Sequence, residues 1–112
     1  MRKVIFVTGN AGKFREAKDI LAKKGIEVLQ QTGGYPEIQE DDLEPIAAYG
    51  AKWASEELKM PVMVDDSGLF IQTLNGFPGP YSAFVEKHLG NQKVLKLMEG
   101  ETDRRATFKS VI

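Results

Sequence analysis

Cysteine is absent from the 112-residue sequence, histidine and tryptophan each occur once, and the formal net charge is only -1. Without cysteine the chain has no disulfide, no thiolate metal site and no cysteine nucleophile. One histidine excludes a zinc site made of several imidazoles, and His88 lies too far from Ser67 in sequence to suggest a serine hydrolase. The near-neutral charge argues against a protein that coats nucleic acid.

Long apolar runs are also missing. The longest such run near the N-terminus is Val4–Val7, whereas a membrane-spanning helix needs ~20 apolar residues and a signal peptide needs a longer core than this. We therefore expect no membrane partner and a cytoplasmic location. A hydrophobic fraction of 42% with 28% charged residues is typical of a globular chain. We predict a single α/β domain over residues 1–112.

The first third of the sequence has a strand-helix-strand pattern. Val4–Val7 is β-branched and aromatic, as expected for a strand buried on both faces. Phe14, Ala17 and Leu21 follow with helical spacing, and Gly25 is a typical helix C-terminal signal. Later segments continue the alternation, with predicted helices over Leu43–Lys59, Tyr81–Leu89 and Gln92–Met98, and predicted strands over Ile26–Gln31, Pro61–Val64, Leu69–Leu74 and Arg105–Ile112.

The last predicted strand reaches Ile112 without a turn or cap. Strands normally end in turn residues. We therefore expect the chain to be a fragment of a longer protein.

The loop between the first strand and the first helix has the composition of an anion site. Glycine lets backbone N–H groups approach a ligand, and the helix N-terminus and Lys13 add positive charge. The loop does not match a Walker A motif, because Phe14 follows Lys13, nor a dinucleotide fingerprint, because Ala11 stands where a second glycine is needed. The alternative is a plain turn with a surface lysine. The candidate residues are Thr8, Gly9, Asn10, Ala11, Gly12 and Lys13.

Carboxylates mark a second candidate site. Asp65 and Asp66 precede Ser67 and Gly68 directly after an apolar strand, and carboxylates at a strand end can hold Mg²⁺ together with phosphates. The same residues also favour a plain turn. Glu37, in the acidic loop Thr32–Asp42, is either a solvated charge or a further metal ligand.

Together these motifs resemble those of the inosine triphosphate pyrophosphatase family. The residues of the segments Tyr35–Gln39 and Gly76–Val85 are most similar to those of archaeal members. The matching segments are Thr8–Lys13, Tyr35–Gln39, Val64–Leu69, Leu74–Ser82 and Arg105–Phe108. The resemblance implies a mixed twisted sheet flanked by helices, forming most of one lobe of an elongated two-lobed fold. Family members continue past the equivalent of Ile112, where they carry the residues of the base pocket.

The resemblance also implies an activity and assigns roles to residues. Family members use Mg²⁺ to hydrolyse non-canonical purine nucleoside triphosphates, such as ITP, dITP and XTP, to the monophosphate and pyrophosphate, usually as homodimers. By position, Thr8–Lys13 and Ser67 would contact substrate, and Lys52 matches a further family lysine that would bind substrate. Glu37 and Asp66 would bind the metal, as would Asp65 with a weaker match, and Asp66 would accept a proton from the attacking water.

A different class of function stays open at this point. The same loop could serve a non-catalytic module that binds nucleotides or phosphate. Both proteins would bind a triphosphate, but only the enzyme would release pyrophosphate and need Asp66 for turnover.

Overall fold

A computed structural model describes residues 2–112, and these residues form two compact units. The first unit comprises the chain up to Gln39, Pro45–Asp65 and Ile112, and the second comprises Glu40–Glu44 and Asp66–Val111. The predicted α/β class is confirmed, because each unit combines a sheet with helices. The assignment of residues 1–112 to one domain stays a prediction.

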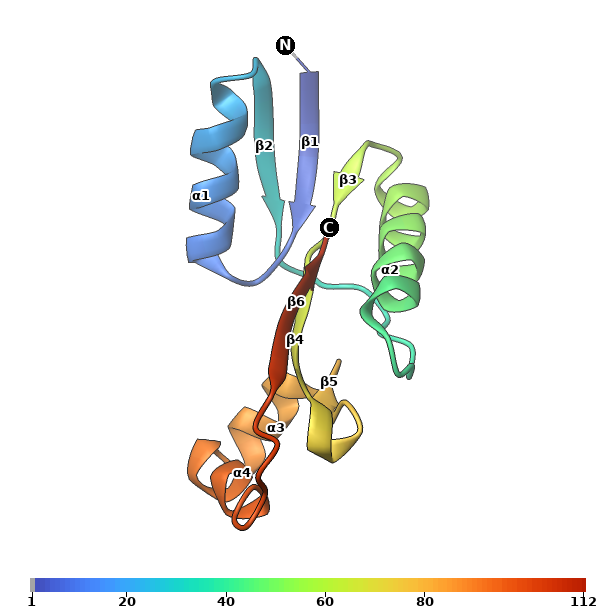
Figure 1. Ribbon diagram of the computed structural model, residues 1–112. Helices are drawn as coiled ribbons and strands as arrows, with labels where there is room; N and C mark the ends of the chain where they lie inside the picture. The colour runs from blue at the N-terminus through green and yellow to red at the C-terminus, as the bar shows by residue number, and fades with distance from the viewer. Residues whose placement is uncertain (1) are drawn as a thin grey trace. The chain divides into compact units, whose positions relative to one another are not determined.

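The first unit is built on a parallel, three-stranded sheet with strand order β2-β1-β3 (Figure 1). Its strands are β1 (Arg2–Val7), β2 (Ile26–Gln31) and β3 (Val62–Met63). β1 pairs with β2 along its whole length and with β3 at two residues, Ile5↔Val62 and Phe6↔Met63. Because all three strands are parallel, their carboxyl ends lie at the same edge of the sheet.

Two helices belong wholly or mainly to this unit, α1 (Ala11–Ala22) and α2 (Leu43–Leu58). The predicted apolar face of α1 is half-buried, and the helix contacts β2. The buried face of α2 includes Gly50, where an added Cβ would lie 2.3 Å from the Tyr35 ring. The buried apolar side chains of the unit are Phe6, Val7, Val28, Ile46, Ala47, Ala54 and Val64.

The second unit contains an antiparallel sheet with strand order β5-β4-β6. Its strands are β4 (Asp66–Ile71), β5 (Pro78–Gly79) and β6 (Ala106–Val111). The unit also contains a short 3-10 helix, η1 (Gln72–Leu74), and two helices, α3 (Ser82–His88) and α4 (Asn91–Leu97). The family resemblance led us to expect a mixed sheet; the described strands form one parallel and one antiparallel sheet, each of three strands.

The interpretation of residues 65–68 as a turn was wrong for its last three residues. Asp66, Ser67 and Gly68 are the first residues of β4, and they pair with Val111, Ser110 and Lys109 of β6. The turn preference of Asp, Ser and Gly is local, and the ladder to β6 overrides it. Asp65 is outside β4 and joins it to the parallel sheet.

Two ion pairs lie within the second unit. Lys109 Nζ of β6 forms an ion pair with Glu44 Oε1 in the first turn of α2. The hydrogen bond that Lys109 donates to Glu44 lowers the pKa of this carboxyl group. Just before β6, Arg105 Nη2 lies 2.9 Å from Asp103 Oδ2, and the hydrogen bond from Arg105 lowers the pKa of Asp103 to about 2.

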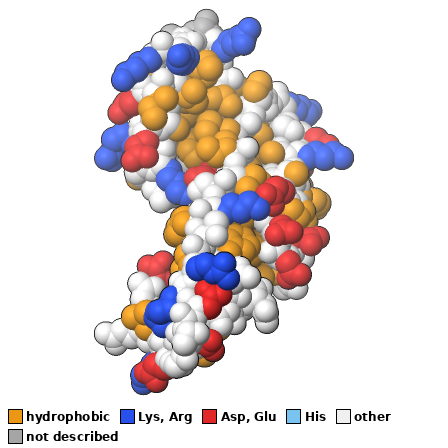
Figure 2. Space-filling model, viewed as in Figure 1, with side chains coloured by type: hydrophobic (Ala, Val, Ile, Leu, Met, Phe, Trp, Pro, Cys, Tyr) orange, Lys and Arg blue, Asp and Glu red, His pale blue; other side chains and the backbone are white. Residues whose placement is uncertain are grey.

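The surface of the parallel sheet that faces the viewer is apolar. Figure 2 shows hydrophobic side chains gathered over these strands, with Lys and Arg side chains around them. Within residues 2–112, no helix combines the length and the apolar character needed to cross a membrane.

Gly68 supplies a stability test of the second sheet. An alanine Cβ at this position would lie 2.2 Å from the carbonyl oxygen of Gly79, which is backbone and cannot rotate away. We expect Gly68→Ala to lower the free energy of unfolding by about 1–3 kcal/mol. The measurement is urea denaturation followed by circular dichroism.

Gly9→Ala is the matched control for this prediction. An added Cβ at Gly9 meets nothing within 4 Å, so its effect should stay within about 0.5 kcal/mol. Equal stability of the Gly68→Ala variant and the wild type would contradict the close approach of β4 and β5.

Candidate functional site

The loop segment Thr8–Lys13 comprises the connection after β1 and the first residues of α1, and it folds on its own hydrogen bonds. Asn10 is the N-cap of α1, with extended backbone angles, and its Oδ1 accepts a hydrogen bond from the Lys13 N–H at 3.0 Å. The Thr8 hydroxyl accepts a hydrogen bond from the Asn10 N–H at 3.1 Å. Asparagine is among the best N-cap residues because its short side chain satisfies a helix donor that has no partner within the helix. The loop therefore has a defined conformation before any ligand binds.

The neighbouring strand β2 fixes the base of this loop. The Thr8 N–H donates to the Gln31 carbonyl at 3.0 Å, and Gln30 Nε2 donates to the Thr8 carbonyl at 3.1 Å. The sequence did not predict this role of Gln30, because it requires the parallel register of β1 and β2. Both backbone groups of Thr8 are thereby held, and the rest of the loop is anchored at one end.

The loop offers positive potential to a ligand. The first N–H groups of an α-helix have no partner within the helix, and they carry the positive end of the helix dipole. The first turn of α1 contains no acidic residue that would offset this potential. Residues 9–12 are exposed to solvent, and an added Cβ at Gly9 would stand in open space. An anionic group, and a phosphate in particular, suits this arrangement.

Lys13 is held by a carboxylate at the same edge of the sheet. Its Nζ lies 2.9 Å from Asp65 Oδ2, and the two side chains are 39% and 15% exposed. Asp65 follows β3 just as the loop follows β1, so the parallel pairing of these strands brings the two residues together. The structure therefore joins two candidate sites that the sequence placed in separate segments.

The second oxygen of Asp65 is unusual. Asp65 Oδ1 is buried and has no hydrogen-bond partner among the described residues. Buried carboxylate oxygens are normally satisfied by a donor or a cation. A hard divalent cation such as Mg²⁺ prefers oxygen ligands of this kind, so the residue present fits such an ion.

The other predicted metal ligands lie in different settings. Glu37 is exposed in the irregular segment of the first unit, and Asp66 is half-buried at the start of β4 in the second unit. Within residues 2–112, no group of three or more His, Cys, Asp or Glu side chains is arranged to hold a metal. Mg²⁺ often uses only one or two protein carboxylates and completes its shell with phosphate oxygens and water. The joint role of Glu37, Asp65 and Asp66 stays a prediction.

Lys52 lies exposed on α2. Lys52 belongs to the same unit as the loop and Glu37. Its role as a substrate contact stays a prediction.

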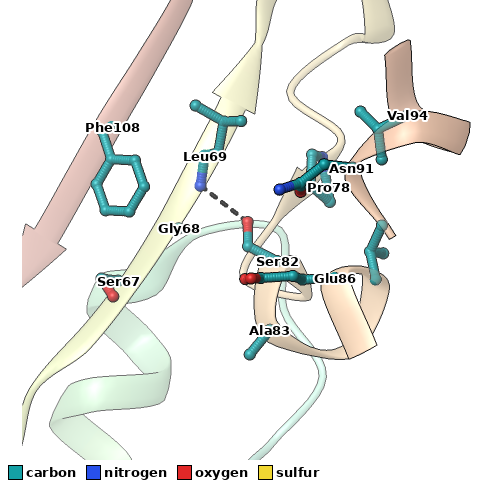
Figure 3. A pocket seen from close by; sticks show the side chains of 11 residues that line it. Ser67, Gly68, Leu69, Pro78, Ser82, Ala83, Glu86, Asn91, Val94 and Phe108 are labelled. Atoms are coloured by element: carbon teal, nitrogen blue, oxygen red, sulfur yellow. Dashed lines mark hydrogen bonds between the residues drawn. The ribbon is translucent and has the colours of Figure 1, made fainter. Parts of the chain in front are cut away.

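Ser67 lines a cavity of about 340 Å³ in the second unit (Figure 3). Ser82, at the start of α3, lines the same cavity and joins β4 to β5. Its Oγ accepts a hydrogen bond from the Leu69 N–H at 2.8 Å and donates one to the Gly79 carbonyl at 2.7 Å. Sequence reasoning did not identify this role of Ser82; its place at the start of a helix was the available signal. The mostly apolar wall around Ser67 includes Leu69, Pro78, Val94 and Phe108.

Comparison with known proteins identifies the family. A family model described as "Ham1 family" matches residues 4–112, nearly the whole sequence. The chain belongs to the Ham1 family. Among relatives of this Ham1-family chain, a protein of Methanosarcina acetivorans named "dITP/XTP pyrophosphatase" is 68% identical over 112 residues, which is 100% of this chain and 61% of the relative. A protein of Methanopyrus kandleri with the same name is 60% identical over 110 residues, covering 98% of this chain and 58% of the relative.

Solved Ham1 structures share the fold of this chain. The Ham1 protein of Staphylococcus aureus superposes with a TM-score of 0.81 at 26% identity, over 97% of this chain and 60% of that protein. A HAM1 protein of Coxiella burnetii gives a TM-score of 0.82 at 28% identity, over 99% of this chain and 61% of that protein. The family resemblance inferred from the motifs is thus confirmed. The chain spans about three fifths of the length of the curated relatives it matches.

The cap of α1 gives a direct test of the loop geometry. Asn10→Ala removes the acceptor of the Lys13 N–H, so we expect the free energy of unfolding to fall by about 0.5–2 kcal/mol. Asn10→Asp keeps an oxygen at the same place and should retain most of the stability. Urea denaturation of the three proteins measures the difference, and an alanine variant as stable as the wild type would contradict the cap.

Proposed function

We propose that the protein hydrolyses non-canonical purine nucleoside triphosphates, such as ITP, dITP and XTP, to the monophosphate and pyrophosphate in a Mg²⁺-dependent reaction. One observation in this Ham1-family chain carries the proposal. A capped, glycine-containing loop and a carboxylate follow two adjacent parallel strands, and the Lys13 Nζ of that loop lies 2.9 Å from Asp65 Oδ2. The names of the archaeal relatives support the substrate class.

The loop would bind the phosphates. A triphosphate carries about four negative charges, and a site for it needs several donors and cations. The exposed N–H groups at the start of α1 and the Lys13 ammonium supply them from one side. Lys52 and Ser67 are proposed as further substrate contacts, following their positions in the family motifs.

Asp65, Asp66 and Glu37 would hold the metal. The unpartnered Oδ1 of Asp65 supports the part of Asp65 in this set, and Asp66 and Glu37 are included on their positions in the family motifs. When bound, Mg²⁺ neutralises phosphate charge and makes a phosphoryl group easier to attack. Asp66 would act as general base by accepting a proton from the attacking water, which requires its carboxylate to be ionised. Its half-buried position next to Asp65 in the chain is compatible with that role.

Two further parts of the proposal have different sources: the family resemblance implies a homodimeric enzyme, and the lack of long apolar runs led us to expect a cytoplasmic location. The resemblance implies a nucleoside triphosphate and pyrophosphate as ligands. The near-neutral charge and the short apolar runs led us to expect neither nucleic acid nor a membrane as a partner.

Release of pyrophosphate from ITP tests the proposed function. The assay compares the 112-residue chain with a chimera that continues it with the remaining part of the Methanosarcina acetivorans relative. In the chimera, Asp66→Asn should reduce turnover at least ~100-fold, because it removes the general base. Asp19→Asn, which changes an exposed acid on α1, is the control.

Near wild-type turnover by the Asp66→Asn chimera at saturating Mg²⁺ would remove Asp66 from catalysis. A chimera that binds ITP without releasing pyrophosphate would favour a binding module.

Lys13→Ala tests the phosphate site separately. If the ammonium reads the phosphate tail, the variant should lose more affinity for ITP than for IMP, by roughly 1.5–3 kcal/mol. Isothermal titration calorimetry with both nucleotides measures this difference. Equal losses for the two ligands would show that Lys13 does not contact the terminal phosphates.

A further inference from the structure

The Lys13–Asp65 ion pair places a negative charge inside a site proposed to bind anions. Asp65 Oδ2 lies 2.9 Å from Lys13 Nζ, and the Asp65 side chain is only 15% exposed. Water screens a charge at this depth less than a charge on the open surface. A phosphate that approaches Lys13 therefore meets a lysine whose charge is already offset, with a carboxylate directly behind it.

The same carboxylate has an open coordination position. Oδ1 is buried and has no hydrogen-bond partner among the described residues, so it is the oxygen with most to gain from a cation. A divalent cation held by the Asp65 carboxylate would offset its charge and weaken the ion pair between Asp65 and Lys13. Lys13 would then present its charge to phosphate in full.

From this geometry we propose that Asp65 makes the loop selective for a metal-complexed polyphosphate over a metal-free one. The inference rests on the proposed function, since it takes Thr8–Lys13 to be the polyphosphate site. In the metal-free protein, Asp65 opposes phosphate binding by neutralising Lys13 and by direct repulsion. With a divalent cation present, the opposition is lost, so that cation and phosphate each strengthen the binding of the other.

A simpler role for Asp65 would have the opposite signature. If the carboxylate only oriented the Lys13 side chain, its removal would leave the ammonium less ordered and would weaken phosphate binding with or without metal. If Asp65 only bound metal, its removal would have no effect on binding measured without metal. The sign of the change in metal-free binding therefore separates the three roles.

The experiment is calorimetry of the 112-residue chain with inorganic pyrophosphate, once in EDTA and once in millimolar Mg²⁺. In EDTA, Asp65→Asn should bind pyrophosphate about tenfold more tightly than the wild type, which corresponds to about 1.4 kcal/mol. The affinity ratio between the Mg²⁺ and EDTA conditions should fall in the same variant. In a Lys13→Ala background, Asp65→Asn should give a smaller gain, because only the direct repulsion is left to remove.

Asp19→Asn is the matched control, because it removes the same charge from an exposed position on α1 of the same unit. It should change the affinity in EDTA by less than about twofold, as expected for a solvent-screened charge. A similar gain in Asp19→Asn and Asp65→Asn would reduce the effect to net charge and overturn the inference.

Unchanged or weaker binding by Asp65→Asn in EDTA would also overturn the inference while leaving the proposed function intact. Failure of the wild type to bind pyrophosphate even with Mg²⁺ would overturn both. A readout on the wild type alone guards against misfolding of the variant. Mg²⁺ without phosphate should increase the labelling of Lys13 by an amine-reactive ester, relative to the labelling of the exposed Lys24. Labelling of Lys13 that does not respond to Mg²⁺ would contradict the release of Lys13 from Asp65.

Discussion

The parallel pairing of β1 with β3 is the constraint on which the site depends. The two strands share only the pairs Ile5↔Val62 and Phe6↔Met63. If that register is continued by two residues, Thr8, the first residue of the candidate loop, falls opposite Asp65. The Lys13–Asp65 contact at 2.9 Å follows from this alignment, because parallel strands bring their carboxyl ends to one edge. A slip of one residue would turn Asp65 toward the other face of the sheet and separate the two groups.

Hydrogen bonds within the loop, and between the loop and β2, fix the conformation of the chain at this edge of the sheet. The Asn10 cap and the two hydrogen bonds from β2 to Thr8 give the loop one conformation. A preformed loop loses less conformational entropy on binding than a flexible one, so more of its interaction with a phosphate is retained as affinity. In the proposal made above, Asp65 opposes this affinity until a cation offsets its charge. By the same proposal, the site would bind a polyphosphate more tightly when it is complexed with a divalent ion. Nucleoside triphosphates react in this complexed form in Mg²⁺-dependent enzymes.

Much of this arrangement was predictable from the sequence, for identifiable reasons. The β-branched run Val4–Val7 and the strand Ile26–Gln31 carry strong local signals, and Gly25 occupies a left-handed conformation at φ 75° after α1. The segment Thr8–Lys13 was correctly predicted to lie at the N-terminus of a helix. The family motifs identified the remaining candidates, and the match to the Ham1 model over residues 4–112 confirmed that resemblance.

The failures occurred where distant segments decide the structure. Asp66, Ser67 and Gly68 have turn propensities, yet their partners on β6 lie about forty residues later in the chain and draw them into a strand. Gly68 is explained by the Gly79 carbonyl on a neighbouring strand rather than by a turn. The ion pair between Lys13 and Asp65, and the role of Gln30, likewise require a strand register that one sequence does not contain.

At the carboxyl ends of β1 and β3, the proposed site would bind polyphosphate and a divalent cation together. The most direct measurement is a crystal structure of the chain grown with Mg²⁺ and imidodiphosphate. We expect phosphate oxygens within hydrogen-bond distance of the backbone N–H groups of residues 9, 11 and 12 and of Lys13 Nζ, with the cation on the Asp65 carboxylate. Ligand bound instead in the cavity beside Ser67, with the loop empty, would contradict it.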